Sequence, residues 1–336
     1  MNKTAVLIFI IITAAYGCSK TAMPASPPPQ AQLPQATATP DPFFWEKAAD
    51  ERVFPAFNYG ALAVHNSRLF IFGTASEDGK TMNYIFSTGD VASFITVTAK
   101  AQDEAPEEFK VLTHDRKLWV IYGPPQEGDE EEKALPRVFS SDRGDNFRRV
   151  EVKKGFAVVS GFSAFVFKNR MHIAFGRDSS GLIDDIYSSN NGREWDKLKQ
   201  GKVTVPPREG AVVAVFKERL WVIGGAGKGG VLNDVWYTED LKDWKPATVN
   251  AAFTPGKDYE AVVHKDRIWL MGGTGDDGKP MDNMWWSMDG ANWRLGADKI
   301  PVGAYKGIKA AAFKGGIAAA AGFDGREYNK NIWWME

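Results

Sequence analysis

Residues 219–245, RLWVIGGAGKGGVLNDVWYTEDLKDWK, contain the pattern that decides the fold of this 336-residue chain. An apolar run ends in two glycines, a second apolar run carries Trp236, and Trp244 follows eight residues later, beyond a turn-forming segment. The pattern recurs six times. The positions equivalent to Gly225, spaced by 49, 53, 49, 48 and 49 residues, are Thr74, Gly123, Gly176, Gly225, Gly273 and Gly322. Self-similarity at a period of roughly 20–50 residues indicates a repeat architecture.

Each repeat predicts four short strands. The strand that ends at the glycines follows an earlier one across a turn such as Lys265-Asp266-Arg267. The runs are apolar without alternation, which is typical of strands buried on both faces. The third strand carries an aromatic residue in every repeat, at Phe86, Phe139, Tyr187, Trp236, Trp285 and Trp333. A fourth-strand aromatic follows in five repeats, at Phe94, Phe147, Trp195, Trp244 and Trp293.

The sixth repeat ends at Glu336 without a fourth-strand aromatic, and the missing residue is found near the start of the chain. Trp45 lies 29 residues before Thr74, just as Trp293 lies 29 residues before Gly322. The sequence therefore predicts an all-β fold over residues 41–336, a six-bladed β-propeller of four-stranded blades. Its N-terminal strand completes the last blade, which closes the ring and removes an open sheet edge.

Two local motifs resemble those of known propeller families. The paired glycines after the second strand, with the fourth-strand tryptophan, resemble kelch repeats, most clearly in the fourth and fifth units. The turn before the fourth strand, clearest in residues 140–147 (SSDRGDNF), resembles the Asp-box of sialidases. Both resemblances imply a β-propeller, and the kelch resemblance implies a place in the superfamily that includes galactose oxidase.

The first 18 residues resemble a lipoprotein signal peptide. Lys3 precedes an 11-residue apolar stretch, which is too short to span a bilayer. The segment ends AYGC, similar to a bacterial lipobox, and Cys18 is the only cysteine of the chain. An ordinary signal peptide cut nearby, with a spare thiol, is the alternative. Residues 19–40 are rich in proline, alanine and glutamine, as expected of a tether. Ser19 after the cysteine resembles an outer-membrane sorting signal, so we expect a protein that is lipid-anchored in the bacterial cell envelope, at the outer membrane.

The charge of the chain is balanced, with 41 basic and 42 acidic residues. Without a basic excess, a nucleic acid is a poor candidate partner, and only the lipid anchor is expected to meet the membrane. Residues 225–230, GAGKGG, satisfy a GxGxxG pattern, but a dinucleotide site needs a helix where another strand is predicted. Three of the four histidines, His65, His114 and His264, share one register at the end of the first strand in units one, two and five, where they cannot converge on one metal ion. With one cysteine besides, we predict no cofactor and no metal site.

Polar residues at the start of each first strand form the predicted ligand site. In propellers these strands line the central channel, and the loops that lead into them surround one mouth together with the loops between strands two and three. Convergent polar groups in a concavity are the default site hypothesis, although the mouth of any propeller is polar and wet. The predicted set, with Glu108 beside it, is Tyr59, Lys110, Arg208, Glu209, Asp258, Tyr259, Glu260, Tyr305 and Lys309. Aromatic and mixed-charge groups suit an anionic or sugar-like ligand.

Two classes of function fit these features. The first is a non-catalytic module that binds a protein or carbohydrate ligand at the mouth of the propeller. The alternative is a carbohydrate-active enzyme of the sialic-acid mutarotase or sialidase-like type. Bacterial six-bladed kelch proteins include such a mutarotase, which uses an arginine and a glutamate, and Arg208 with Glu209 are the nearest candidates. Copper-radical oxidation is excluded, because it needs a crosslinked cysteine beside histidine ligands.

Overall fold

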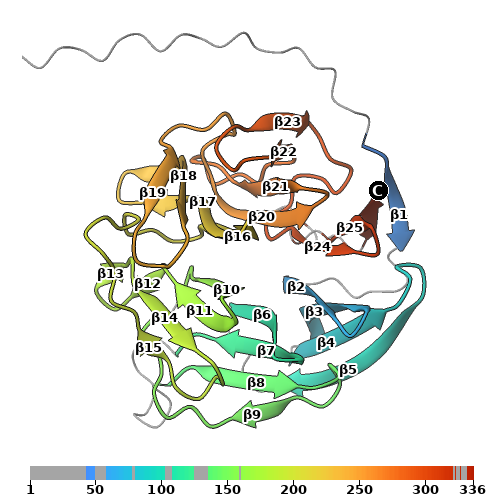
Figure 1. The fold of residues 1–336 in the computed structure, drawn as a ribbon. Coiled ribbons are helices and arrows are strands. Elements are labelled where there is room, and N and C mark those ends of the chain that lie inside the picture. Colours follow the sequence, from blue (N-terminus) through green and yellow to red (C-terminus); the bar gives the residue numbers. More distant parts are fainter. Residues whose placement is uncertain are drawn as a thin grey trace, which may run out of the picture. The chain divides into compact units, whose positions relative to one another are not determined.

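The computed structural model describes residues 43–49, 58–77, 80–102, 108–124, 135–158, 160–320, 322, 326 and 331–336. These residues form strands and turns, and none of them lies in a helix, so none belongs to a helix that could cross a membrane. The strands assemble into six four-stranded antiparallel sheets, which are the blades of a β-propeller (Figure 1). The predicted fold class is confirmed.

The first three blades follow one another along the chain. Blade 1 contains β2 (Asn58–His65), β3 (Arg68–Glu77), β4 (Lys80–Thr88) and β5 (Phe94–Gln102). Blade 2 contains β6 (Phe109–His114), β7 (Lys117–Tyr122), β8 (Arg137–Ser141) and β9 (Arg148–Val150). Blade 3 contains β10 (Ser163–Phe167), β11 (Arg170–Ala174), β14 (Ile186–Ser189) and β15 (Asp196–Lys197), and its central loop adds the small hairpin β12 (Arg177–Asp178) and β13 (Gly181–Leu182).

The last three blades are more regular. Blade 4 contains β16 (Val212–Phe216), β17 (Arg219–Gly227), β18 (Gly230–Thr238) and β19 (Lys245–Thr248). Blade 5 contains β20 (Lys257–His264), β21 (Arg267–Thr274), β22 (Met284–Ser287) and β23 (Arg294–Ala297). Blade 6 contains β24 (Lys309–Phe313), β25 (Gly316–Ala320), β26 (Ile332–Met335) and β1 (Trp45–Ala49).

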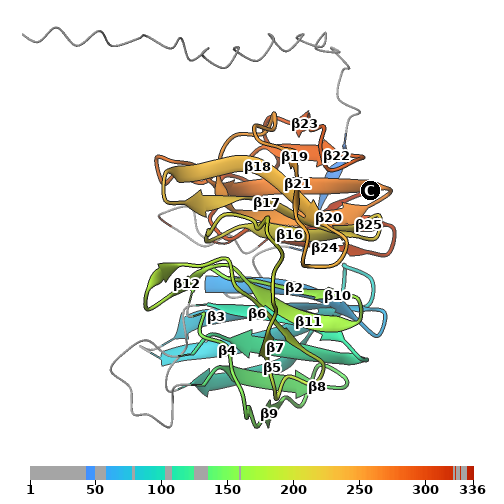
Figure 2. The same ribbon diagram turned by 60° about the vertical axis from the view of Figure 1, so that its left-hand side comes forward.

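The ring closes through its inner strands. Each first strand contacts the first strands of the two neighbouring blades, in the order β2, β6, β10, β16, β20, β24 and back to β2. Figure 1 shows these strands around the centre of the ring, and Figure 2 shows the blades from another side. The second strands are the most deeply buried, as in β17, where Leu220 to Gly225 are all buried. A blade packs against a neighbour on each side, and this explains the absence of apolar–polar alternation in the sequence.

The paired glycines of blades 4 and 5 have a backbone reason. Gly224 and Gly225 adopt φ angles of +57° and +100°, and Gly272 and Gly273 adopt +65° and +89°. A Cβ atom on Gly225 would lie 2.9 Å from the carbonyl oxygen of Glu209, closer than van der Waals contact allows. Two consecutive left-handed residues that are pressed against another loop favour glycine at both positions.

The turns between third and fourth strands share one hydrogen bond. A hydroxyl at the end of the third strand accepts from the backbone N–H three residues later, as in Ser189 to Gly192 at 2.9 Å and Ser287 to Gly290 at 2.8 Å. The turn brings the fourth-strand tryptophan back onto the blade. The Trp293 indole then donates to the carbonyl oxygen of Gly290 at 3.0 Å.

The N-terminal strand completes blade 6, as the spacing of Trp45 predicts. Strand β1 pairs antiparallel with β26, with Trp45 opposite Met335 and Lys47 opposite Trp333. Trp45 and Phe43 pack against the apolar core between blades 5 and 6, and the ring of Phe43 meets Trp269 edge to face at 4.9 Å.

We therefore predict that a chain beginning at Lys47 is much less stable than one beginning at Asp41. The shorter chain loses the partly buried rings of Trp45 and Phe43, which pack against the core, and half of the β1–β26 pairing. Loss of one fully buried aromatic costs about 3–5 kcal/mol, so the loss of two partly buried rings should cost about 3 kcal/mol, a large part of a net stability of about 5–15 kcal/mol. Thermal and denaturant unfolding of both chains measures the difference. Equal melting temperatures would show that β1 adds nothing to the closure of the ring.

Candidate functional site

Three blades are tied together at one mouth of the channel by backbone hydrogen bonds between equivalent residues. The N–H of Gly210 donates to the carbonyl oxygen of Gly161 at 2.9 Å, and the N–H of Asp258 donates to that of Gly210 at 2.8 Å. All three residues precede or begin a first strand and have positive φ, +62°, +60° and +56°. At the open end of this chain, the N–H of Gly161 donates to Oε2 of Glu108 in blade 2 at 2.7 Å.

Glu209 is the centre of the charged cluster that these loops carry. Its Oε2 accepts from Nε of Arg177 at 2.6 Å, and Nζ of Lys257 lies 3.3 Å from its Oε1. The three residues come from blades 3, 4 and 5, and the Glu209 side chain is 17% exposed. Partial burial by itself would raise the pKa of Glu209, but the two cations reverse this effect and lower it below its usual value. Glu209 is therefore ionised at neutral pH.

A second group of charges faces the channel from blades 2, 5 and 6. Lys110 pairs with Glu108 at 2.8 Å, and Lys309 lies 3.6 Å from Glu260. Removal from water alone would lower the pKa of Lys110, but the carboxylates of Glu108, Asp258 and Glu260 raise it above its usual value. Blades 2 and 5 lie across the ring from one another (Figure 1), so Lys110 and the carboxylates of blade 5 interact electrostatically across the channel.

The carboxyl groups of blade 5 are less easily ionised than Glu209. Loss of hydration raises the pKa of both Asp258 and Glu260, although Lys110 and Lys309 oppose the effect. The mouth thus holds both cations and carboxylates, some half-buried and some exposed, and its carboxyl groups differ in proton affinity. Such an arrangement is suited to hydrogen bonding and charge pairing with a small polar ligand.

Most of the predicted site residues converge on this mouth. Glu209, Asp258, Glu260, Lys309 and Lys110 belong to the charged cluster. Of the remaining residues, Tyr305 is half-buried against the core between blades 5 and 6. For Tyr59 the structure describes only the backbone, in β2, and Cys18 lies outside the described residues.

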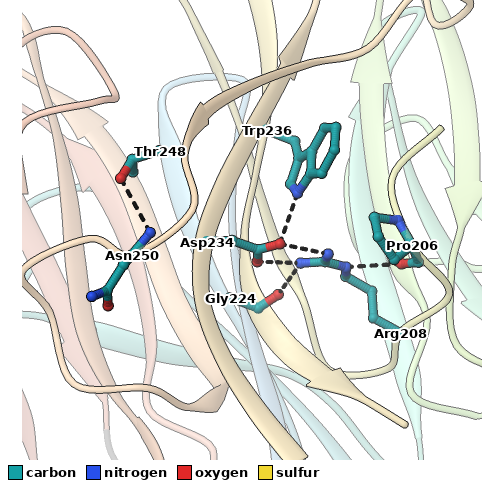
Figure 3. A network of polar contacts seen from close by, with 7 residues as sticks. All are labelled: Pro206, Arg208, Gly224, Asp234, Trp236, Thr248 and Asn250. Atoms are coloured by element: carbon teal, nitrogen blue, oxygen red, sulfur yellow. Dashed lines mark hydrogen bonds and ion pairs between the residues drawn. The ribbon is translucent and has the colours of Figure 1, made fainter. Parts of the chain in front are cut away.

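The prediction that Arg208 lines the mouth needs correction, because its side chain is fully buried within blade 4. Its guanidinium forms a bidentate pair with Asp234, with distances of 2.6 and 2.9 Å, and also donates to the carbonyl oxygens of Gly224 and Pro206 (Figure 3). The Trp236 indole donates to the same Asp234 carboxylate at 2.7 Å. Arg208 is thus a structural residue without a free face for a ligand.

The same correction applies to Tyr259. Its ring is 3% exposed and packs edge to face against Phe253 at 5.8 Å, while its hydroxyl donates to the carbonyl oxygen of Thr254. Successive side chains of a strand point to opposite sides. Asp258 and Glu260 face the channel, so Tyr259 between them turns into the gap between blades 4 and 5.

Two residues of the cluster, Arg177 and Lys257, were not predicted. Arg177 directly follows Gly176 in the loop between second and third strands, a class of loop expected at this mouth, and Lys257 directly precedes Asp258. Position in the repeat could have indicated both. Among the described residues, no three histidine, cysteine or acidic side chains lie close enough together to hold a metal ion.

Comparison with known proteins adds information on the fold. No protein-family model matches the chain, and neither does any curated protein sequence. Among solved structures, YjhT superimposes with a TM-score of 0.62, over 84% of this chain and 94% of YjhT. The sequence identity is 13%, so the similarity concerns the fold alone. It supports the six-bladed β-propeller.

We predict that Asp234→Ala strongly destabilises the protein, because it leaves the buried Arg208 guanidinium without its counter-charge. Breaking a buried pair in this way typically costs about 3–5 kcal/mol. A matched control is Glu239→Ala, which removes the partner of Arg219 from a solvent-exposed pair in the same blade and should cost about 1 kcal/mol or less. The free energy of unfolding in urea compares the two variants, and similar losses would contradict the structural role of Arg208.

Proposed function

We propose that this protein is a binding propeller of the bacterial cell envelope, whose channel mouth takes a small acidic sugar or a similar polyhydroxylated anion. The observation that carries the proposal is the position of Glu209 between Arg177 and Lys257, at 2.6 and 3.3 Å. A ligand carboxylate can pair with these two cations. The carboxylates of Glu209 and Glu260 can accept hydrogen bonds from ligand hydroxyls.

A mutarotase-like activity is the second candidate, and the Arg177–Glu209 pair favours it. Interconversion of sugar anomers needs a group that takes a proton from one oxygen and a group that returns it to another. Glu209 is ionised at neutral pH and is therefore in the protonation state in which it can accept a proton from a ligand hydroxyl. The arginine that would accompany it is Arg177, since Arg208 is committed to Asp234.

The kelch-type assignment belongs to the same proposal. It is supported by the paired left-handed glycines of blades 4 and 5 and by the fourth-strand tryptophans Trp244 and Trp293, both buried. The shared hydroxyl-capped turns support the Asp-box resemblance in the same way.

N-acetylneuraminate is a suitable probe, because it has a carboxylate, several hydroxyls and two anomers. We expect saturable binding by calorimetry, and we expect Lys257→Gln and Arg177→Gln each to weaken it about tenfold or more, as expected for loss of a charge-assisted hydrogen bond. Glu239→Gln, which changes an exposed pair in the same blade as Glu209, is the control and should bind normally.

Proton NMR of freshly dissolved anomer separates the two functions. Faster equilibration that Glu209→Gln abolishes would favour the enzyme. Binding without any acceleration would favour the non-catalytic module. Absence of binding by the wild-type protein would contradict the proposed site. So would binding by the Lys257→Gln and Arg177→Gln variants that is as tight as that of the wild type.

Attachment to the membrane through Cys18 is proposed from the sequence. Cysteine is used once in the chain, behind a short apolar segment and before a proline-rich stretch. Two or more acyl chains are enough for stable anchoring. The propeller would then face the periplasm or the cell surface, where small sugars are accessible.

We expect Cys18→Ser to move the protein from the membrane fraction to the soluble fraction of the producing cell. Immunoblotting after a high-salt wash measures the distribution, and Ser19→Ala is the control that keeps the cysteine. Retention of the Cys18 variant in washed membranes would place the anchor elsewhere.

A further inference from the structure

In two of the gaps between successive blades, an aromatic side chain from the linker that joins the blades fills the space. In the gap between blades 2 and 3 the filling residue is Phe156, which is buried. Its ring contacts the fourth-strand aromatic Trp195 at 5.2 Å, the third-strand aromatic Tyr187 at 6.1 Å and Phe162 at 6.1 Å. Phe162 stands just before the first strand of blade 3.

The gap between blades 4 and 5 is filled in the same manner. Phe253 is buried there and contacts the fourth-strand aromatic Trp293 at 5.3 Å and Tyr259, the equivalent of Phe162, at 5.8 Å. A phenyl ring from the linker therefore occupies one position relative to the repeat in two separate gaps, and in both it contacts the fourth-strand aromatic and the aromatic at the start of the first strand.

The gap between blades 1 and 2 has equivalent aromatic neighbours, but among the residues that the structure describes no linker ring lies in this position. The equivalents of Trp195, Tyr187 and Phe162 are Phe147, Phe139 and Phe109. These three line a cavity of about 250 Å³, whose wall also includes the polar residues Asn83, Thr98 and Asp145. Each of the three is partly exposed, whereas each counterpart in blade 3 is buried.

The sequence explains why the chain supplies no filling side chain here. The linker before blade 2, residues 103–108, reads DEAPEE, and the loop after β7, residues 123–134, reads GPPQEGDEEEKA. Neither contains an aromatic residue or a large aliphatic one. These two segments adjoin strands that line the cavity, and their residues are mainly acidic or small, so neither segment has a side chain that would fill it.

We propose that this cavity is a binding site for the aromatic ring of a small ligand, distinct from the channel mouth. The equivalent gaps between blades 2 and 3 and between blades 4 and 5 show that aromatic neighbours of this kind accommodate a ring in this position. An engineered apolar cavity of about 150 Å³ binds benzene, so a cavity of about 250 Å³ has room for a bicyclic ring. Asn83, Thr98 and Asp145 add hydrogen-bonding groups to the apolar wall, and they favour a heteroaromatic ring with an N–H donor.

Indole is the probe for this site, and ligand-observed NMR with calorimetry measures its binding to the intact protein. We expect one site in the wild-type protein. Phe147→Trp places in blade 2 the larger ring that blades 3, 4 and 5 carry, and it should weaken indole binding at least tenfold while the melting temperature is kept or raised. Phe94→Trp is the matched control, since it makes the same change in blade 1, away from the cavity, and should bind indole normally.

Two further variants keep the test decisive if Phe147→Trp does not fold. Asn83→Phe fills the cavity from blade 1 and should also weaken binding at least tenfold. Phe156→Ala removes the ring between blades 2 and 3 and should add a second indole site, which doubles the stoichiometry. The proposal is overturned if wild-type protein does not bind indole, or if both filling variants bind it as tightly as the wild type. The proposal is also overturned if the two filling variants weaken the binding of methyl glucoside and leave the binding of indole unchanged.

Discussion

Burial of both faces of every blade is the constraint on which this structure depends. The second strands, such as β17 and β21, are almost entirely buried, so neither face of these strands is available to water. A blade with one neighbour would expose a full apolar sheet face, at roughly 25 cal/mol per Å². Only a closed ring supplies two neighbours to each blade. This requirement gives β1 its importance, because pairing with β26 completes the last blade where the two ends of the ring meet.

Ring closure also creates the charged mouth. First strands from all blades face a common axis, and the linked backbone of Gly161, Gly210 and Asp258 holds three of their loops in one layer. Side chains far apart in sequence therefore share a small volume, as Arg177, Glu209 and Lys257 do. The mixture of signs limits repulsion and leaves half-buried groups whose proton affinities differ. That is the physical basis for expecting an acidic, hydroxylated ligand at this end of the channel.

Packing between blades offers a second kind of site, because the repeat is not uniform. Phe156 and Phe253 fill their gaps, whereas the described part of the chain shows no linker ring in the gap between blades 1 and 2. The same rule that stabilises the ring, an apolar side chain in each gap, produces a cavity wherever a linker departs from it. Ligand binding at such a gap would couple to the stability of the ring, while binding at the mouth would couple to its electrostatics.

The sequence alone determined the architecture, since a six-fold repeat with its last aromatic displaced to Trp45 has one simple solution. It also located the mouth, because position in the repeat fixes which residues begin the first strands, as Lys110, Glu260 and Lys309 do. Only the tertiary structure decided which of those side chains face the channel. Adjacent residues of a strand point in opposite directions, so Tyr259 turns away from the axis that Asp258 and Glu260 face. The Arg208 side chain does not line the mouth, because it pairs inside blade 4 with Asp234, which lies 26 residues further along the chain. Arg177 and Lys257 belong to the mouth because each forms an ion pair with Glu209. Such pairs form between side chains that folding brings together, whatever their separation in sequence.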